Sequence, residues 1–211
     1  MFEQMKGAIF DLDGVIVDTA KYHYLAWRSL AEELGFEFTE EDNERLKGVS
    51  RMESLNILLE IGRIDASDEE RERMAASKNE RYVEFISRLH ESELLPGVRA
   101  YLTDLRSRGV KIALGSASKN AEFILSKLNI RGLFDAVVDG NQVVNAKPDP
   151  EVFLIACRKL GLEPAECVVF EDAAAGVQAA IAAGMGVVGI GRADLLPGAD
   201  KVVSGVDELI A

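Results

Sequence analysis

Two aspartates stand close together near the start of the chain, in the stretch GAIFDLDGVIVDT at residues 7–19. Asp11 ends an apolar run, and Asp13 follows it just before a glycine. Aspartate is common at turns and helix caps, but an unpaired carboxylate at the end of a buried strand is unfavourable. A divalent cation relieves both the burial and the mutual repulsion of two such groups. The pair therefore predicts a Mg²⁺ site, because Mg²⁺ prefers a few carboxylate oxygens together with water and substrate phosphate.

A second acidic pair supports this prediction. Glu171 and Asp172 follow another apolar run in VVFEDAAAG at residues 168–176, just before a helical pattern. Read alone, the pair also fits carboxylates placed at a helix N-terminus, where the helix dipole favours them. If the strands are parallel, however, these carboxylates lie at the same sheet edge as Asp11, and they then become candidate metal ligands.

Candidate phosphate-binding groups follow two further apolar runs. The run IALGSASKN at residues 112–120 passes into hydroxyl and amide side chains between Ser116 and Asn120. Hydroxyls and backbone N–H groups at a strand-to-helix turn can hold phosphate, although serine before a helix is also ordinary capping. Lys147 stands directly before Pro148, and a lysine fixed in this way is a better site candidate than a lone surface lysine.

Acidic groups for a metal, a lysine and a serine-lined turn at one sheet edge together suit phosphoryl transfer. In that reaction, positioning and charge neutralisation supply most of the catalysis. Asp11 is the natural nucleophile and would form an aspartyl-phosphate. Asp13 would protonate the leaving oxygen and deprotonate the acceptor.

The elements that must position these residues are strands alternating with helices. Apolar runs end in polar or glycine-rich sequence five times, in KGAIF, VKIALG, FDAVV, CVVF and GVVGI, and KVVSG near the C-terminus is a candidate for one more strand. Continuous apolar strands separated by helical patterns indicate a parallel sheet covered on both faces. Ligands of such sheets collect at the carboxyl ends of the strands. The fold class is therefore predicted as α/β, with a Rossmann-like doubly wound parallel sheet.

One long stretch departs from the alternation. Between residues 18 and 91 the sequence holds helical patterns and no convincing strand. We therefore predict a helical cap at residues 18–91, inserted into a catalytic core formed by residues 1–17 and 92–211.

Composition limits the functions available to the 211-residue chain. A hydrophobic fraction of 48% and a charged fraction of 28% are those of an ordinary globular protein. The net charge of −12 argues against a nucleic-acid partner, and no apolar run reaches the length of a membrane span. The first residues do not resemble a signal peptide, so we expect a cytoplasmic protein, and nothing demands more than a monomer. Cys157 and Cys167 are predicted to be reduced core residues.

These residues resemble the haloacid dehalogenase superfamily of phosphotransferases. Four signatures of the superfamily occur in order, namely DLDGVIVDT, the serine in LGSAS, the lysine in AKPDP, and FEDAAAG. The resemblance implies a Rossmann-like core and a helical cap of the first insertion type. It also implies Mg²⁺ held by Asp11, the Asp13 carbonyl and Asp172, with Glu171 near it.

The cap sequence looks like that of sugar-phosphate mutases within this superfamily. The matching segments are YHYLAW at 22–27, LKGVSR at 46–51 and ASKNERYV at 76–83, together with SASKN at 116–120. The resemblance implies a small-molecule sugar phosphate as substrate. It implies that β-D-glucose 1-phosphate and glucose 6-phosphate interconvert through glucose 1,6-bisphosphate, an activating intermediate.

Roles carried over by position are expectations of this resemblance. The transferring phosphoryl group would be held by Ser116, Ala117 and Lys147. The distal phosphate would be gripped by Arg51, Ser118, Lys119 and Asn120. Asp13 or cap closure would be assisted by His23 and Lys47, with Thr19 nearby. The sugar would be faced by Gly48, Val49, Ser54, Lys78 and Asn79. One departure is Gly115, where alanine is expected before the serine.

Three functions compete for this sequence. The first is a sugar-phosphate mutase, and the second is a phosphatase in which water attacks the aspartyl-phosphate. The third, a non-catalytic phosphate-binding module, is disfavoured because every expected catalytic position is filled. A mutase must hold a substrate with phosphates at both ends, and Arg51 with Lys119 and Asn120 could supply the second cationic site.

Overall fold

The computed structural model describes residues 5–46 and 49–210. The chain divides into two compact units, Met1–Asp18 with Leu89–Ala211, and Thr19–Arg88. The first unit contains a sheet and is called the core. The second is built from helices and is called the cap.

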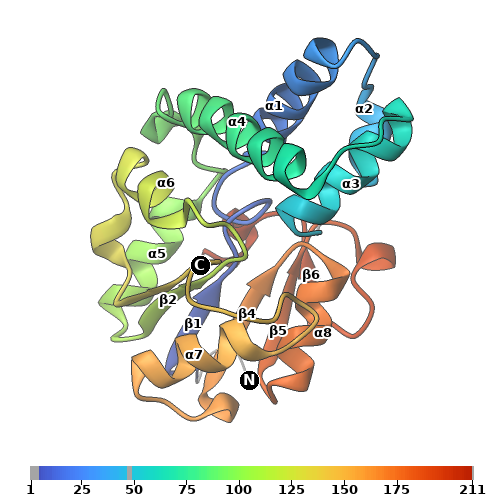
Figure 1. Ribbon diagram of the computed structural model, residues 1–211. Helices are drawn as coiled ribbons and strands as arrows, with labels where there is room; N and C mark the ends of the chain where they lie inside the picture. The colour runs from blue at the N-terminus through green and yellow to red at the C-terminus, as the bar shows by residue number, and fades with distance from the viewer. Residues whose placement is uncertain (1–4, 47–48, 211) are drawn as a thin grey trace. The chain divides into compact units, whose positions relative to one another are not determined.

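The core holds a six-stranded parallel sheet (Figure 1). Its strands are β1 (Gly7–Phe10), β2 (Lys111–Gly115), β3 (Ala136–Val138), β4 (Cys167–Glu171), β5 (Gly186–Ile190) and β6 (Lys201–Val203). Their order is β3-β2-β1-β4-β5-β6, which is the doubly wound arrangement with β1 at its centre. Each of the six apolar runs forms a strand, so the predicted α/β class is confirmed.

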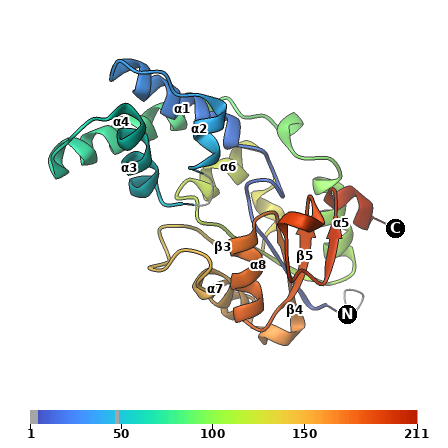
Figure 2. The same cartoon turned by 90° about the vertical axis from the view of Figure 1, so that its right-hand side faces the viewer.

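Helices cover both faces of this sheet (Figure 2). They are α5 (Val98–Ser107), α6 (Ala121–Lys127), α7 (Glu151–Leu160) and α8 (Ala174–Ala182), with short 3₁₀ turns at Glu91–Glu93, Arg131–Leu133, Pro164–Glu166, Ala193–Leu195 and Val206–Leu209. Strand side chains alternate between faces, so Ile9 and Val169 pack on the side of α7 and α8, whereas their neighbours face α5. Cys157 and Cys167 are buried and free in this core, as predicted.

Aromatic rings fill the face of the sheet beneath α5. Phe10 and Phe170, on adjacent strands, stack with ring centroids 4.4 Å apart. Tyr101 of α5 meets both rings edge-on, at 6.2 Å and 5.7 Å. These contacts tie the two central strands to the helix above them, and both strands lead directly into the acidic residues of the predicted site.

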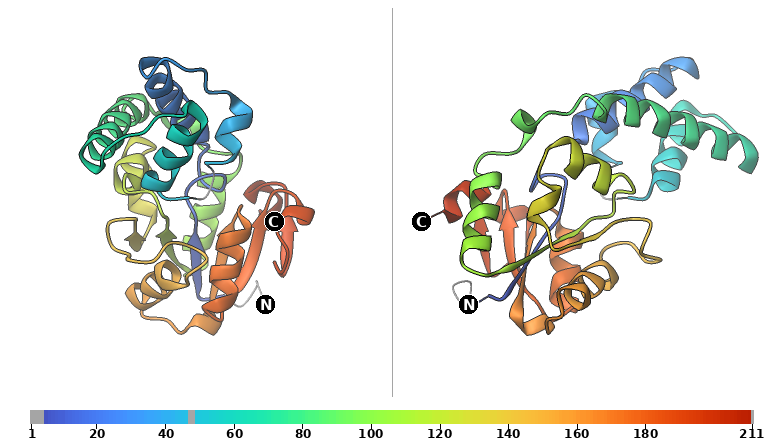
Figure 3. Two further views of the ribbon diagram at one scale, coloured as in Figure 1. Left: turned by 45° about the vertical axis from the view of Figure 1, so that its right-hand side comes forward. Right: turned by 90° about the vertical axis from the view of Figure 1, so that its left-hand side faces the viewer.

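The cap consists of α1 (Ala20–Glu33), α2 (Glu40–Glu44), α3 (Arg51–Gly62) and α4 (Asp68–Ile86) (Figure 3). Its described residues form no strand. Trp27, Ala31, Leu55 and Leu58 lie in a hydrophobic core of its own. Ser67 begins α4 with a capping box, since its hydroxyl accepts from the Glu70 N–H.

Across the two described ranges, the chain has no helix that combines the length and the apolar character needed to cross a membrane.

Phe170→Ala should destabilise the core strongly, because it removes a fully buried ring and leaves a cavity beside Phe10. We expect a loss of about 3–5 kcal/mol in the free energy of unfolding, measured by urea denaturation. Phe123→Ala is the matched control, since Phe123 is 38% exposed and its loss should be below about 1 kcal/mol. Similar losses in the two variants would contradict this packing.

Candidate active site

The register of the two central strands brings the acidic residues together. Phe10 of β1 lies opposite Phe170 of β4, so the next residues, Asp11 just after β1 and Glu171 at the end of β4, lie side by side. The Asp11 N–H donates to the Phe170 carbonyl at 2.9 Å. Both carboxylates are buried, with 8% of Asp11 and 2% of Glu171 exposed. The predicted gathering of acids at one sheet edge is therefore present in the core.

Lys147 places its ammonium group between these carboxylates. Its Nζ donates to Asp11 Oδ1 at 2.5 Å and lies 3.4 Å from Glu171 Oε2. Nζ also stands 4.7 Å from the ring centroid of Phe153. Burial by itself lowers the pKa of Lys147, but the charges and hydrogen bonds of Asp11 and Glu171 together raise it above its ordinary value. Lys147 is therefore a permanent cation at neutral pH.

One lysine does not balance the negative charge at this edge. Asp11, Glu171 and Asp172 each offer an oxygen, and the three oxygens lie within 4.8 Å of one another. Burial and the charge of Asp11 raise the pKa of Glu171 well above its usual range. Burial and the charges of Asp11 and Asp13 raise the pKa of Asp172 to about 7. A crowded, partly buried set of oxygen donors of this kind is what a hard divalent cation prefers.

Two glycines make room for this cluster. A Cβ on Gly14 would lie 2.0 Å from Asp172 Oδ2, and a Cβ on Gly176 would lie 1.9 Å from Glu171 Oε1. Gly14 also has a φ of +75°, which favours glycine. The glycines within DLDG and FEDAAAG therefore leave space for the carboxylates.

The segment 116–120, here called the phosphate loop, follows β2. The Ser116 N–H donates to the Val138 carbonyl at 3.0 Å. The Ser116 hydroxyl accepts from the Ser118 N–H at 3.1 Å, and the Ser118 hydroxyl accepts from the Asn120 N–H at 3.3 Å. Ser116 is buried, whereas Ala117 and Lys119 are exposed. The loop is therefore a folded turn that presents polar groups at the same edge as Asp11.

Gly115, the departure from the expected alanine, has a structural reason. A Cβ at this position would lie 2.9 Å from the ring of Phe153. Phe153 is the same ring that stands beneath the Lys147 ammonium. The missing methyl group therefore lets Phe153 sit close to the end of β2.

In the cap, the buried Lys78 pairs with the half-buried His23. Lys78 Nζ lies 2.8 Å from His23 Nδ1, and only 2% of Lys78 is exposed. The same Nζ stands 4.4 Å from the ring centroid of Trp27 and 5.0 Å from that of Tyr82. Burial, followed by the charge of Arg51, lowers the pKa of Lys78 to about 7.

The rings around Lys78 also fix His23. Its imidazole stacks on Tyr82 with centroids 3.9 Å apart. Burial, then the charges of Lys78 and Arg51, lowers the pKa of His23 well below its usual value, so the ring is neutral. When Lys78 is protonated it donates to Nδ1, which leaves the His23 proton on Nε2.

Other predicted cap residues lie close to this pair. Arg51 donates to the Asn79 side-chain oxygen at 2.8 Å, and the Tyr82 hydroxyl donates to Thr19 Oγ1 at 3.2 Å. Ser54 is buried and Val49 is exposed. The cap residues within the described ranges that had been predicted from sequence are Thr19, His23, Val49, Arg51, Ser54, Lys78 and Asn79. Lys47 and Gly48 lie outside the described residues.

Trp27 and Tyr82 are not among the predicted site residues, yet their rings surround the Lys78 ammonium. Trp27 follows His23 by four positions, and Tyr82 follows Lys78 by four positions. Side chains four apart in a helix are neighbours, so this spacing was the signal that an aromatic box surrounds the lysine.

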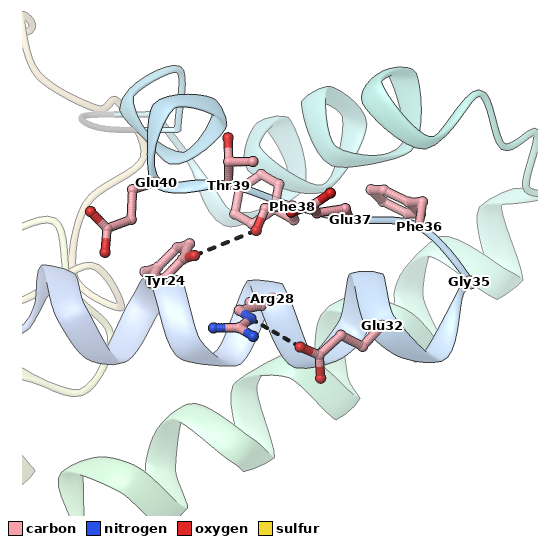
Figure 4. Close-up of a pocket in the computed structure, with 9 residues that line it drawn as sticks. All are labelled: Tyr24, Arg28, Glu32, Gly35, Phe36, Glu37, Phe38, Thr39 and Glu40. Atoms are coloured by element: carbon pink, nitrogen blue, oxygen red, sulfur yellow. Dashed lines mark hydrogen bonds and ion pairs between the residues drawn. The ribbon is translucent and has the colours of Figure 1, made fainter.

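The cap also has a cavity of about 660 Å³ beside α1 (Figure 4). The Tyr24 hydroxyl donates across it to the Phe38 carbonyl at 3.5 Å, and Arg28 pairs with Glu32 on its wall. Among the described residues, none of those predicted to bind substrate lines this cavity.

A sheet edge of this kind, with a buried aspartate, a lysine and a carboxylate cluster, is the architecture of a phosphoryl-transfer enzyme. Residues 5–184 match the family model of haloacid dehalogenase-like hydrolases. The chain therefore belongs to the haloacid dehalogenase-like family, and the predicted resemblance is confirmed.

Individual relatives include both mutases and phosphatases. β-Phosphoglucomutase of Bacillus subtilis is 44% identical over 207 residues, which cover 97% of this chain and 92% of that protein. A phosphorylated-carbohydrates phosphatase of Thermotoga maritima is 38% identical, with 86% and 82% covered. Among solved structures, β-phosphoglucomutase from Clostridium difficile is 44% identical with a TM-score of 0.90, and covers 97% of this chain and 93% of that one.

Lys78→Met should reveal the low pKa of Lys78 through the pH dependence of stability. The pKa of Lys78 is about 7 in the folded chain, against the ordinary lysine value of 10.5 expected for the unfolded chain. Between these two pH values the unfolded chain binds more protons than the folded chain, so the free energy of unfolding rises with pH. At about 1.4 kcal/mol per pKa unit, wild type should gain about 2.7 kcal/mol relative to the variant between pH 6 and pH 9 in urea unfolding.

Lys127→Met, at an exposed position, is the control and should keep a constant difference from wild type over the same range. A difference between wild type and Lys78→Met that does not change with pH would show that Lys78 titrates normally.

Proposed function

We propose that this chain is a β-phosphoglucomutase that interconverts β-D-glucose 1-phosphate and glucose 6-phosphate. The observation that carries the proposal is Lys147 bonded to Asp11 within the partly buried carboxylate cluster. The 44% identity to a β-phosphoglucomutase over 97% of the chain supports this substrate. The proposed enzyme is a cytoplasmic monomer that acts on a soluble sugar phosphate.

Asp11 is the proposed nucleophile. One of its carboxylate oxygens attacks the phosphorus of glucose 1,6-bisphosphate, the bond from phosphorus to the sugar oxygen breaks, and an aspartyl-phosphate forms. The fixed positive charge of Lys147 stabilises the negative charge that gathers on the transferring group. Ser116 and Ala117 of the phosphate loop hold the remaining phosphoryl oxygens.

Asp13 is the proposed acid and base. It takes the proton from the sugar 6-hydroxyl as that oxygen attacks the aspartyl-phosphate, which converts β-glucose 1-phosphate into the 1,6-bisphosphate and frees Asp11. In the second half-reaction Asp11 attacks the phosphorus at C1, and Asp13 returns the proton to the leaving C1 oxygen. Glucose 6-phosphate is released and the phosphoenzyme is regenerated.

The acidic cluster fits Mg²⁺ as the cofactor. The ion would be held by Asp11, the Asp13 carbonyl and Asp172, with Glu171 beside them, because the cluster offers only oxygen donors and carries more negative charge than Lys147 offsets. When bound, Mg²⁺ would neutralise phosphate charge during transfer.

The remaining roles concern the substrate's far end and the sugar. We assign the distal phosphate to Arg51, Ser118, Lys119 and Asn120, and the sugar to Gly48, Val49, Ser54, Lys78 and Asn79. His23, Lys47 and Thr19 assist Asp13 or cap closure. A neutral His23 with its proton on Nε2 is a hydrogen-bond donor suited to holding a carboxylate.

A phosphatase is the second candidate, because relatives include a fructose-1-phosphate phosphatase of Escherichia coli that is 35% identical over 90% of this chain. In that reaction water replaces the sugar hydroxyl. A mutase needs a second phosphate site, and the Arg51 guanidinium, bonded to Asn79, is the cap cation that favours the mutase.

The test supplies β-glucose 1-phosphate, Mg²⁺ and a trace of the 1,6-bisphosphate, and measures glucose 6-phosphate separately from free phosphate. Wild type should form the isomer. Arg51→Ala should lower mutase kcat/KM by about 10- to 100-fold, since hydrogen bonds to charged groups contribute about 1.5–3 kcal/mol, with hydrolysis of a small phosphomonoester unchanged.

Arg45→Ala is the matched control, because Arg45 pairs with Glu60 on the cap surface, and it should retain both activities. Release of phosphate by wild type without isomer would favour the phosphatase. Equal loss of both activities in Arg51→Ala would remove the reason for preferring the mutase.

A further inference from the structure

The turn that follows β3 contains a buried carboxylate held by its own neighbours. Only 6% of Asp139 is exposed. Its Oδ1 accepts from the Asn141 N–H at 2.9 Å and from the Gln142 side chain at 3.3 Å, and its Oδ2 accepts from the Asn141 carboxamide at 3.1 Å. An aspartate bonded to the backbone two residues on is a stable turn, so the position and orientation of Asn141 are well defined.

This turn lies against the phosphate loop. The second acceptor of the Asn141 carboxamide is the Lys119 carbonyl, at 3.0 Å. The Gly140 N–H donates to the Ser118 carbonyl at 3.2 Å. A Cβ on Gly140 would lie 2.2 Å from the Ala117 carbonyl oxygen. Three consecutive carbonyls of the phosphate loop therefore face residues 140–141.

The direction of these carbonyls determines where the loop's donors point. In a trans peptide the C=O of one residue and the N–H of the next point in opposite directions. With the carbonyls of residues 117–119 turned toward Gly140 and Asn141, the N–H groups of residues 118–120 point away from them. The loop's serine hydroxyls already accept from the first and third of these N–H groups, whereas the Lys119 N–H has no acceptor among the described residues. That N–H is available to an anion.

We propose that Asn141 is a positioning residue for distal-phosphate binding. Its carboxamide donates to Asp139 and to the Lys119 carbonyl together and so fixes the C-terminal side of Lys119. The Gly140 N–H of the same turn holds the Ser118 carbonyl, which orients the Lys119 N–H toward the phosphate. Asn141 touches neither the substrate nor Asp11 in this role. The inference rests on the proposed function, because the proposed bisphosphate substrate supplies the distal phosphate that the phosphate loop would bind.

The experiment compares two phosphoryl donors. Glucose 1,6-bisphosphate has a distal phosphate, and acetyl phosphate has none. In Asn141→Ala, the KM for the bisphosphate should rise about 5- to 10-fold, the size of one hydrogen bond, with kcat changed less than about twofold. Acetyl phosphate hydrolysis should stay at the wild-type rate.

Gln142→Ala is the matched control. Gln142 donates to Asp139 and to the Val137 carbonyl, so its loss disturbs the same turn without touching the phosphate loop, and the KM for bisphosphate should not rise. Asn141→Asp keeps the shape but replaces the donor with an acceptor, and should raise that KM as alanine does. Asn141→Gln keeps the carboxamide and should reverse at least half of the rise in KM for the bisphosphate.

Thermal melting checks that each variant is folded, and if Asn141→Ala is unfolded the aspartate and glutamine variants decide. A KM unchanged in Asn141→Ala or Asn141→Asp, or one that rises equally in Gln142→Ala, would overturn the inference alone. An equal fall in acetyl phosphate hydrolysis would also overturn it. A wild type that turns over neither donor would overturn the proposed function and this inference with it.

Discussion

The parallel pairing of β1 with β4 is the constraint on which the core site depends. Because Phe10 lies opposite Phe170, the chain cannot place Asp11 at the end of one strand without placing Glu171 beside it. Two buried carboxylates in contact would be unfavourable without compensation. Lys147 supplies part of that compensation, and the oxygen donors that remain define a place for a divalent cation. The charge imbalance is thus a property of the strand register, and the proposed chemistry uses it.

The cap instead buries an amine, where the core buries carboxylates. Lys78 is buried against aromatic rings and a neutral imidazole, and the charge of Arg51 further disfavours its protonation. The Lys78 amine would be protonated readily when a negatively charged ligand binds beside it, because a nearby phosphate favours the charged form of an amine. Each unit has a hydrophobic core of its own, on which its charged groups are placed.

Much of the fold could be read from the sequence, because strand and helix signals are local. The helical patterns between residues 18 and 91 form helices such as α3 at Arg51–Gly62, and all six apolar runs form strands. The core site was also accessible, since acidic and cationic residues placed after parallel strands must meet at one edge. Local patterns could not show that Asn141 supports the phosphate loop, because that contact needs β2 and β3 to be adjacent. The fit of Phe153 against Gly115 could not be read from local patterns either, because it needs α7 to pack against β2.

The central claim is that a carboxylate oxygen of Asp11 carries the phosphoryl group during turnover. Its most direct test is to mix the protein with glucose 1,6-bisphosphate and Mg²⁺, quench in acid, digest, and locate the phosphoryl group by mass spectrometry. The account predicts the adduct on the peptide that contains Asp11, and predicts no adduct in Asp11→Asn or in wild type treated with EDTA. An adduct on any other residue, or full turnover in Asp11→Asn, would contradict it.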